Sequence, residues 1–207
     1  LGFTTKKTMM LAQQLYEGVD VKGEGSVGLL TYIRTDSTRI SDVAQKEAKE
    51  AIAEKYGKEY TPKTPNVYKG RKNTQDAHEA IRPTYLRLSP DKLKDSLKRD
   101  QLRLYRLVYD RFLASQMTPA LYDVMTVHIS GGEYSFRARG SRKVFPGYTI
   151  VYMEANDDGS DEKDINLPDL KEGQMLNLKE WKPEQHFTQP PARYTEASLV
   201  KCWKIWG

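Results

Sequence analysis

Hydrophobic residues recur at helical spacing through most of the first 117 positions of the chain. The first run follows Thr4 and Thr5, either of which suits a helix N-cap, and it ends at Gly18. A second run starts at Ser41 and ends at Gly57. Its expected buried stripe consists of Val43, Ala44, Ala48, Ala51, Ile52 and Tyr56. The pattern therefore predicts two amphipathic helices, each with one face in a core.

A third helix is predicted to start at residues 89–91, where Ser-Pro-Asp places a proline at the first helical position and an acid in the first turn. Apolar residues continue this helical pattern to about Met117, with an interruption near residues 99–100. Between the first two helices, Gly23, Gly25 and Gly28 predict a flexible approach to the Tyr32 segment. Residues 61–73, rich in Pro, Lys and Asn, predict an exposed loop.

After Thr118 the hydrophobic period changes from helical to two. Gly131 and Gly132 form a turn signal between two alternating runs, which predicts a β-hairpin. Residues 144–152 and 175–181 are predicted to be further strands, separated by the acidic loop 156–164. The chain is thus expected to be α+β, with a helical domain at about 20–117 and a strand-rich, antiparallel domain at about 118–185.

The formal net charge of +5 is unevenly distributed along the 207 residues. Residues 1–118 carry 22 Lys and Arg against 15 Asp and Glu, whereas residues 119–207 carry 11 against 13. A basic first part suits a polyanionic partner such as nucleic acid. The single cysteine, Cys202, excludes an internal disulfide framework and a multi-cysteine zinc cluster. With no apolar run of membrane-spanning length and no secretory signal at residues 1–10, we expect a cytoplasmic protein without membrane contact.

The most distinctive chemistry lies at residues 31–38, with the sequence TYIRTDST. A phenol has a pKa of about 10 and is a poor nucleophile at neutral pH, so an attacking tyrosine needs positive charge beside its target. Arg34, two residues after Tyr32, can supply that charge to a phosphate. The alternative is a surface strand that ends in an Asp/Ser/Thr turn, in which Tyr32 only packs.

Residues 28–38 (GLLTYIRTDST) closely resemble the active-site segment of the type IA DNA topoisomerases. Three further segments match the bacterial topoisomerase I branch of that family in the same order along the chain. They are KKTMM at 6–10 with the following helix to Tyr16, QDAHEAIRP at 75–83, and PPARYTEASL at 190–199. Together the four motifs span nearly the whole chain.

The resemblance implies that Tyr32 attacks a single-strand DNA phosphodiester and forms a 5′-phosphotyrosine. Strand passage through the break and religation of the cleaved strand follow. Arg34 would clamp the scissile phosphate, although a structural ion pair with Asp36 is the alternative for this side chain. His78 would exchange a proton or contact phosphate. DNA contacts are also implied for Thr31 and Arg193. Glu79 and Arg82 are expected to order the loop around His78 rather than to catalyse.

The same family carries an acidic Toprim domain that holds Mg²⁺ beside the scissile phosphate. This chain has no Asp-x-Asp pattern after a buried strand and no zinc ribbons. We therefore expect it to be an internal fragment that cannot relax DNA alone, to bind no metal itself, and to depend on the remaining domains of the full enzyme. By the resemblance, residues 1–19 and 186–207 would belong to or return toward the neighbouring DNA-binding domain, and 118–185 to the arch.

Residues 202–207 (CWKIWG) depart from the family pattern, which continues with an amphipathic helix rich in Leu and Glu. Restoring one base in a reverse translation gives Lys-Met-Leu-Glu-Asp-Leu-Gly, so we expect a non-native tail that is disordered or held by incidental contacts.

Two other functions fit the residues. The chain could be a single-stranded nucleic-acid-binding module that uses its basic face and tyrosine stacking without covalent chemistry. It could also be a tyrosine recombinase, which would form the opposite, 3′-phosphotyrosine linkage. The polarity of a trapped covalent product separates all three functions.

Overall fold

The computed structural model describes residues 1–34, 37–68, 78–153, 167–191 and 193–206. The acidic loop 156–164 and the end of the loop predicted at 61–73 lie outside these residues, as does part of the motif at 75–83. The chain divides into two compact units, Leu1–Ala120 with Pro146–Glu154, and Leu121–Phe145 with Ala155–Gly207. The described residues form helices and two antiparallel two-stranded sheets, which confirms the α+β class.

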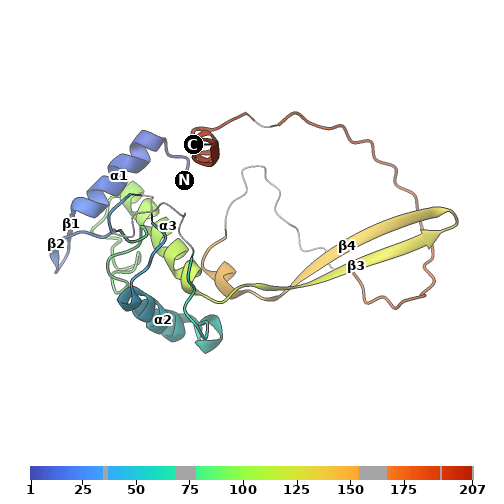
Figure 1. The fold of residues 1–207 in the computed structure, drawn as a ribbon, viewed down its shortest axis with the longest axis horizontal. Coiled ribbons are helices and arrows are strands. Elements are labelled where there is room, and N and C mark those ends of the chain that lie inside the picture. The colour runs from blue at the N-terminus through green and yellow to red at the C-terminus, as the bar shows by residue number, and fades with distance from the viewer. Residues whose placement is uncertain (35–36, 69–77, 154–166, 192, 207) are drawn as a thin grey trace. The chain divides into compact units, whose positions relative to one another are not determined.

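The first two predicted helices are present with their predicted caps (Figure 1). Helix α1 spans Thr5–Glu17, and the Thr4 hydroxyl accepts a hydrogen bond of 3.3 Å from the backbone N–H of Lys7. Helix α2 spans Asp42–Tyr56 with Ser41 as its N-cap, and it is followed by the 3-10 turn η1, Lys58–Tyr60. Each helix ends where a glycine takes a positive φ, 131° at Gly18 and 107° at Gly57. Local sequence signals therefore fix both helices.

One local prediction in the first unit is wrong. Helix α3 spans Arg99–Gln116, so it begins at the expected interruption and not at residues 89–91. Residues 89–97 form consecutive turns that bury Leu93 and Leu97, and Lys98 is extended. Within the glycine-rich approach, β1 (Val19–Val21) and β2 (Gly25–Val27) pair as a short antiparallel hairpin that the sequence pattern did not predict. Three-residue strands are too short to show a periodic pattern.

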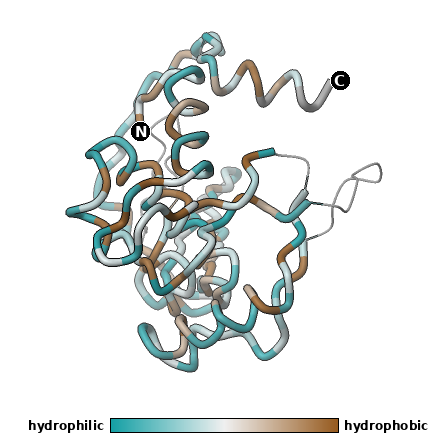
Figure 2. Tube along the Cα trace, turned by 90° about the vertical axis from the view of Figure 1, so that its left-hand side faces the viewer, coloured by the Kyte–Doolittle hydropathy of each residue, from teal (hydrophilic) through white to brown (hydrophobic). Residues whose placement is uncertain are grey.

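A single hydrophobic core holds the helices and turns of the first unit together. Helix α2 contributes Ala44, Ala48 and Ile52, all at most 3% exposed. Val43, predicted to share their stripe, is 78% exposed, because successive residues of a helix are separated by about 100°. Figure 2 shows short hydrophobic stretches alternating with hydrophilic ones along the chain trace of the first unit.

Two buried tyrosines of α3 anchor the segment that follows His78–Pro83. The Tyr105 hydroxyl donates to the carbonyl of Leu88 at 2.8 Å, and the Tyr109 hydroxyl donates to that of Leu86 at 2.9 Å. Burial raises the pKa of Tyr105 and raises the pKa of Tyr109 to about 12. Both phenols therefore stay neutral donors, and they fix the chain just beyond the candidate site.

The second unit contains a long antiparallel hairpin, β3 (Leu121–Gly131) and β4 (Tyr134–Phe145), with the predicted turn at Gly131–Gly132. The strand predicted at 144–152 is wrong, because β4 ends at Phe145 and the 3-10 turn η2 covers Gly147–Ile150. Pro146 and the positive φ of Gly147, 48°, end the strand.

The strand predicted at 175–181 is also wrong, since these residues have no regular structure. Met175 is 90% exposed, and Trp181 contacts the β4 ring of Phe136 at a centroid distance of 5.4 Å. Helix α4 spans Glu196–Trp206, so residues 202–206 are helical and not disordered. The prediction that this tail is non-native stays a prediction.

Candidate active site around Tyr32

The segment that carries Tyr32 is tied to the end of helix α1. The carbonyl of Leu15 accepts hydrogen bonds from the backbone N–H groups of Leu29, at 2.7 Å, and Leu30, at 3.3 Å. A Cβ at Gly28 would lie 2.8 Å from the carbonyl oxygen of Tyr16, so only glycine allows this close approach. Leu29 and Leu30 are buried in the core. One side of the Tyr32 segment is therefore held by backbone contacts and by burial.

The other side pairs with the segment that follows His78. Thr31 N–H donates to the Arg82 carbonyl at 3.0 Å, and the Thr31 hydroxyl donates to the Ala80 carbonyl at 2.8 Å and accepts from Arg82 N–H at 2.9 Å. Leu30 and Pro83 form an isolated antiparallel bridge. Thr31 thus positions the segment through bonds within the chain. Its predicted DNA contact stays a prediction.

Tyr32 lies between two other rings. Its ring centroid is 5.6 Å from that of Tyr16 and 5.1 Å from that of His78, with tilted planes in both pairs. The phenol is 43% exposed, so solvent or a substrate reaches it. The structure therefore brings together Tyr32 and His78, to both of which the resemblance gave catalytic roles, and adds Tyr16, to which the sequence analysis gave no role in the site.

Arg34, like Tyr32, is on the exposed side of the segment. Exposure alternates along the chain, since Tyr32 and Arg34 are exposed while Thr31 and Ile33 are partly buried. Alternation of this kind is typical of an extended backbone, which points residues i and i+2 in the same direction. Arg34 and Tyr32 can therefore meet the same ligand. Asp36 lies outside the described residues, and Arg193 is an exposed residue of the second unit.

An ion pair orders the loop around His78, as predicted. The Glu79 carboxylate accepts from Arg82 Nε at 2.9 Å and Nη2 at 2.6 Å, and also from the backbone N–H of Ser41 at 3.1 Å. Burial alone would raise the pKa of Glu79, but the hydrogen bonds from Ser41 and Arg82 outweigh it and lower that pKa below 4.5. The pair joins the N-terminus of α2 to the loop that places His78 against Tyr32.

We predict that Glu79→Gln lowers the free energy of unfolding at pH 7 by about 1.5 to 3 kcal/mol, the usual contribution of a hydrogen bond to a charged group. Because the pKa of Glu79 is lowered in the folded chain, this stabilisation is present above pH 4.5 and lost as the pH falls below that value. Urea denaturation at pH 7 and at about pH 4 should therefore show the variant and the parent converging in acid. Glu54→Gln, at an exposed position of α2, is the control. A stability gap that stays constant with pH would contradict the role of the charge.

The described part of the chain holds no group of three or more His, Cys, Asp or Glu side chains that could bind a metal ion. Among these residues the structure thus offers no ready-made cluster of ligands for Mg²⁺. No helix in the described ranges is long and apolar enough to cross a bilayer.

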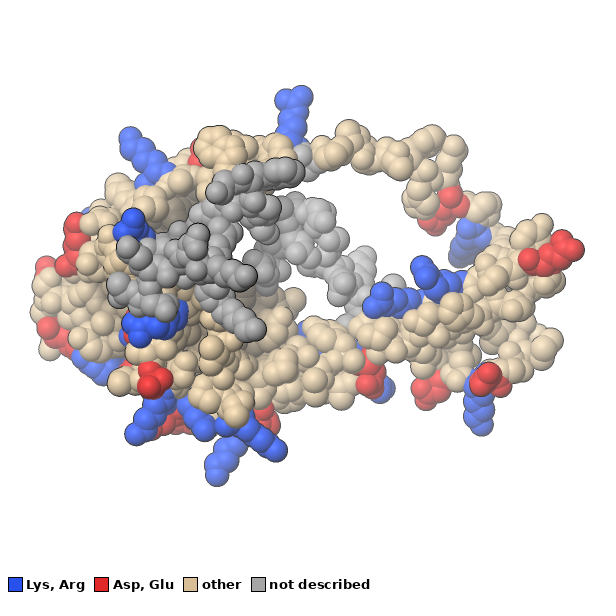
Figure 3. All heavy atoms as spheres, viewed as in Figure 1, with Lys and Arg blue, Asp and Glu red and all other residues tan. Residues whose placement is uncertain are grey.

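One charged surface was missed by the sequence reasoning, which treated residues 119–207 as mildly acidic. Strand register pairs Arg137 with His128, Arg139 with Thr126 and Lys143 with Tyr122. Because strand residues two apart share a face, these side chains lie on one face of the hairpin. The Lys143 ammonium lies 5.6 Å from the Tyr122 ring centroid, which agrees with that placement. Figure 3 shows Lys and Arg side chains gathered along one side of this hairpin.

The opposite face of the hairpin is mainly apolar. It carries Met125, Val127, Ile129, Phe136 and Ala138. Its one described arginine, Arg142, pairs with Asp123 at 3.3 Å. The alternation that predicted the strands also places cationic residues on one face and apolar residues on the other. The cationic face could therefore have been predicted from the sequence.

Two comparisons with known proteins identify the family of this chain. A family model described as DNA topoisomerase matches residues 1–205. The chain is also similar to the structure of full-length topoisomerase I from Thermotoga maritima, at 38% sequence identity and a TM-score of 0.80. That match covers 100% of this chain and 32% of the other, so this chain spans about a third of that protein.

The chain therefore belongs to the DNA topoisomerases, and within them to the bacterial type IA family. The family predicted from the motifs is confirmed. The roles of Tyr32, Arg34, His78, Arg193 and Thr31 remain predictions.

Proposed function

We propose that this chain carries the catalytic tyrosine of an enzyme that relaxes negatively supercoiled DNA through a transient single-strand break. The observation that carries the proposal is the exposed Tyr32 ring, which lies against His78 on a segment anchored on both sides, in a chain of the topoisomerase family. An exposed tyrosine on a fixed backbone suits attack on a large substrate that must enter and leave.

In the proposed reaction, the Tyr32 Oη–phosphorus bond forms as the phosphorus–O3′ bond breaks. The phenol loses its proton, the 3′ oxygen gains one, and the 5′ phosphate remains on the enzyme. Arg34 stabilises the negative charge that develops on the phosphate, and His78 contacts that phosphate or exchanges a proton. Because the number of phosphoester bonds is conserved, attack by the 3′ hydroxyl reseals the strand without a nucleotide cofactor.

In the complete enzyme, Mg²⁺ from a domain outside this chain would supply further charge beside the phosphate. This chain alone is thus not expected to relax DNA, and it acts with the remaining domains of its own protein.

The polarity of the covalent product tests this proposal. The complete enzyme is denatured during turnover on end-labelled single-stranded DNA, and the adduct is mapped by peptide mass spectrometry. We expect protein on the 5′ end of the downstream piece, attached through Tyr32. Protein on the 3′ end would favour the recombinase alternative, and the absence of any adduct would favour the non-catalytic binding module.

The cationic face of the hairpin supports a DNA partner for the second unit as well. We predict that replacing Arg137, Arg139 and Lys143 by Ala reduces the slope of log K against log salt by about 2, since each phosphate contact on single-stranded DNA contributes about 0.7. Fluorescence anisotropy across a salt series measures this slope. Arg142→Ala, on the opposite face, should leave the slope almost unchanged. Equal slopes in the triple variant and the parent would exclude these contacts.

A further inference from the structure

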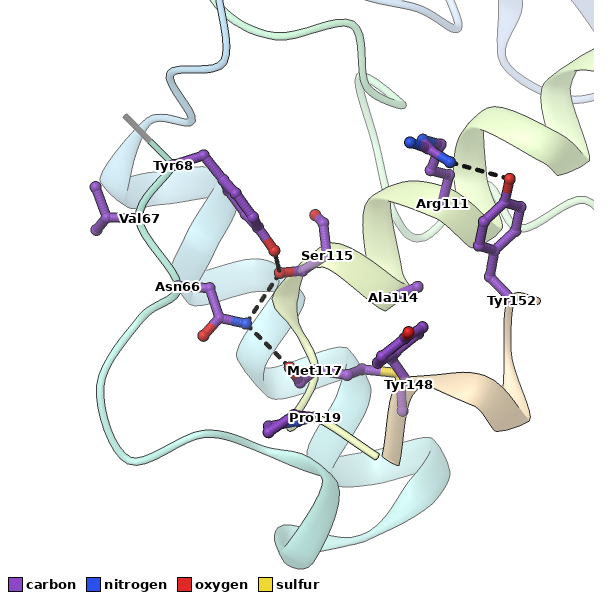
Figure 4. Close-up of a pocket in the computed structure, with 10 residues that line it drawn as sticks. All are labelled: Asn66, Val67, Tyr68, Arg111, Ala114, Ser115, Met117, Pro119, Tyr148 and Tyr152. Carbon is purple, nitrogen blue, oxygen red and sulfur yellow. Dashed lines mark hydrogen bonds between the residues drawn. The ribbon is translucent and has the colours of Figure 1, made fainter. Parts of the chain in front are cut away.

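A cavity of about 500 Å³ lies within the first unit, away from the residues assigned above (Figure 4). The residues of its wall that bear on its chemistry are Asn66, Tyr68, Arg111, Met117, Tyr148 and Tyr152. They come from the loop after α2, from the end of α3, and from η2 with the residues that follow it. Among the described residues, no aspartate or glutamate lines the cavity. Three phenol rings and one guanidinium thus surround a space open to solvent.

Hydrogen bonds hold the loop side of the cavity in place. The Asn66 amide donates to the carbonyls of Ser115, at 3.0 Å, and Met117, at 2.9 Å. The Tyr68 hydroxyl donates to the same Ser115 carbonyl at 2.7 Å (Figure 4). These carbonyls are at the C-terminus of α3, where helix carbonyls have no partner within the helix. The loop therefore supplies hydrogen-bond donors to the carbonyls at the end of α3, and the bond from Tyr68 fixes its ring.

Backbone contacts hold the η2 side of the cavity in place. Tyr148 N–H donates to the Thr118 carbonyl at 3.0 Å. A Cβ at Gly147 would lie 2.3 Å from the carbonyl oxygen of Pro119, so the two chain segments touch at a glycine with positive φ. Tyr148 is 40% exposed although its backbone is held. Its ring is thus presented to the cavity on a rigid support.

Arg111 supplies the positive charge of the cavity. Its Nη1 donates to the Tyr152 hydroxyl at 3.0 Å, and its guanidinium lies 5.3 Å from the Tyr152 ring centroid. Burial raises the pKa of Tyr68, which keeps that phenol neutral. A guanidinium beside neutral aromatic rings is the combination with which proteins bind a phosphate and its neighbouring base. Apolar Met117 and Ala114 complete a wall suited to a planar ring.

A hydrogen bond connects the cavity wall to the catalytic segment. The hydroxyl of Thr38, the last residue of the TYIRTDST motif, donates to the backbone carbonyl of Tyr68 at 3.2 Å. The wall and the Tyr32 segment are therefore parts of the same unit, joined by a direct contact. A strand held at Tyr32 by its scissile phosphate has further nucleotides on either side of that phosphate.

We propose that this cavity is a nucleotide subsite, in which one base stacks on the tyrosine rings and its phosphate pairs with Arg111. The inference rests on the proposed function only in taking a DNA strand as the source of that nucleotide. A free mononucleotide has the same chemistry, and the experiment below separates the two sources. An occupied subsite would hold the strand at a second point beside the cleavage site.

The binding test uses the complete enzyme in a Tyr32→Phe background, where no covalent chemistry contributes. Tyr148→Leu and Arg111→Leu are each expected to weaken the Kd for a single-stranded oligonucleotide by about 5- to 100-fold, the range for losing one stacked base. The matched controls are Tyr85→Leu and Arg87→Leu, because the Arg87 guanidinium lies 5.1 Å from the Tyr85 ring centroid in a similar stack that lines no part of this cavity. The controls should stay within about twofold of the parent.

Crosslinking supplies a measurement that does not depend on a folded variant. An oligonucleotide with 5-iododeoxyuridine placed in turn at each position is irradiated on the Tyr32→Phe enzyme, and the adduct peptides are sequenced. We expect one position to crosslink to Tyr68, Tyr148 or Tyr152. Competition by thymidine monophosphate at concentrations near the Kd of the oligonucleotide would identify a free-nucleotide site instead of a strand subsite.

Unchanged affinity in both cavity variants, together with crosslinks only outside the cavity, would overturn the proposal. Its failure is distinct from failure of the proposed function, which is decided by the Tyr32 adduct of the unmodified enzyme. A 5′ adduct with an unused cavity would retain the topoisomerase mechanism and reject the subsite. A missing adduct together with the expected crosslink would reject the topoisomerase mechanism and retain the subsite.

Discussion

Replacing Tyr32 by Phe in the complete enzyme should abolish DNA cleavage and relaxation while leaving the fold and non-covalent DNA binding nearly intact. Only the attacking oxygen is removed, and the ring contacts with Tyr16 and His78 at 5.6 and 5.1 Å remain available to phenylalanine. Tyr32 is 43% exposed, so removing its hydroxyl should leave no buried hydrogen-bonding group without a partner. Relaxation of supercoiled plasmid and adduct formation on labelled oligonucleotides measure the loss.

Tyr16→Phe is the matched control, because Tyr16 contributes a ring to the same cluster. It should retain cleavage, since the ring contact does not require the second hydroxyl. Residual adduct in Tyr32→Phe, mapped to Tyr16 or any other residue, would show that the nucleophile has been assigned to the wrong side chain. Loss of DNA binding in Tyr32→Phe would instead point to a binding role for the hydroxyl.

Local signals predicted the parts of the fold that depend on a few neighbouring residues. Thr4 and Ser41 cap their helices as expected, because a capping side chain bonds to an N–H only three residues away. The start of α3 could not be predicted in this way. Ser-Pro-Asp at 89–91 is a good local helix start, but burial of Leu93 and Leu97 in the core holds that stretch as turns.

In the candidate site, too, some features were predictable from local sequence and others were not. The motif identified Tyr32, Arg34 and His78, and the structure places the rings of Tyr32 and His78 in contact. The support of the site was not predictable, because the bonds from Thr31 to Ala80 and Arg82 join residues 49 and 51 positions apart. Contacts over such separations follow from tertiary packing and leave no periodic signal in a single sequence. The cavity beside Tyr68 also results from tertiary packing of segments far apart in the sequence, so no local pattern predicted it.

The cationic hairpin face is a different case. Arg137, Arg139 and Lys143 occur at even spacing in a stretch already predicted to be a strand, so their common face followed from the period of two. Summing charge over residues 119–207 concealed it. Charge averaged over a long segment is a poor guide where a strand separates its residues onto two faces.

Arg34→Ala should slow DNA cleavage by about 100- to 1000-fold, corresponding to the roughly 2.7 to 4 kcal/mol lost with one transition-state charge contact. The alternating exposure of residues 31–34 places Arg34 on the same side of its segment as Tyr32, where it can meet the phosphate under attack. Single-turnover cleavage at saturating oligonucleotide separates this chemical step from binding.

Arg34→Lys distinguishes a bidentate clamp from simple positive charge. Lysine keeps the charge but cannot present two parallel N–H donors to one phosphate, so cleavage should fall between the rates of the parent and of Arg34→Ala. Arg39→Ala, at an exposed arginine five residues further along, should cleave at nearly the parental rate. If Arg34→Ala weakened the Kd but left the saturated cleavage rate unchanged, Arg34 would bind the ground state and transition state equally. The developing charge on the phosphate would then have to be stabilised by other groups, in the first place by His78.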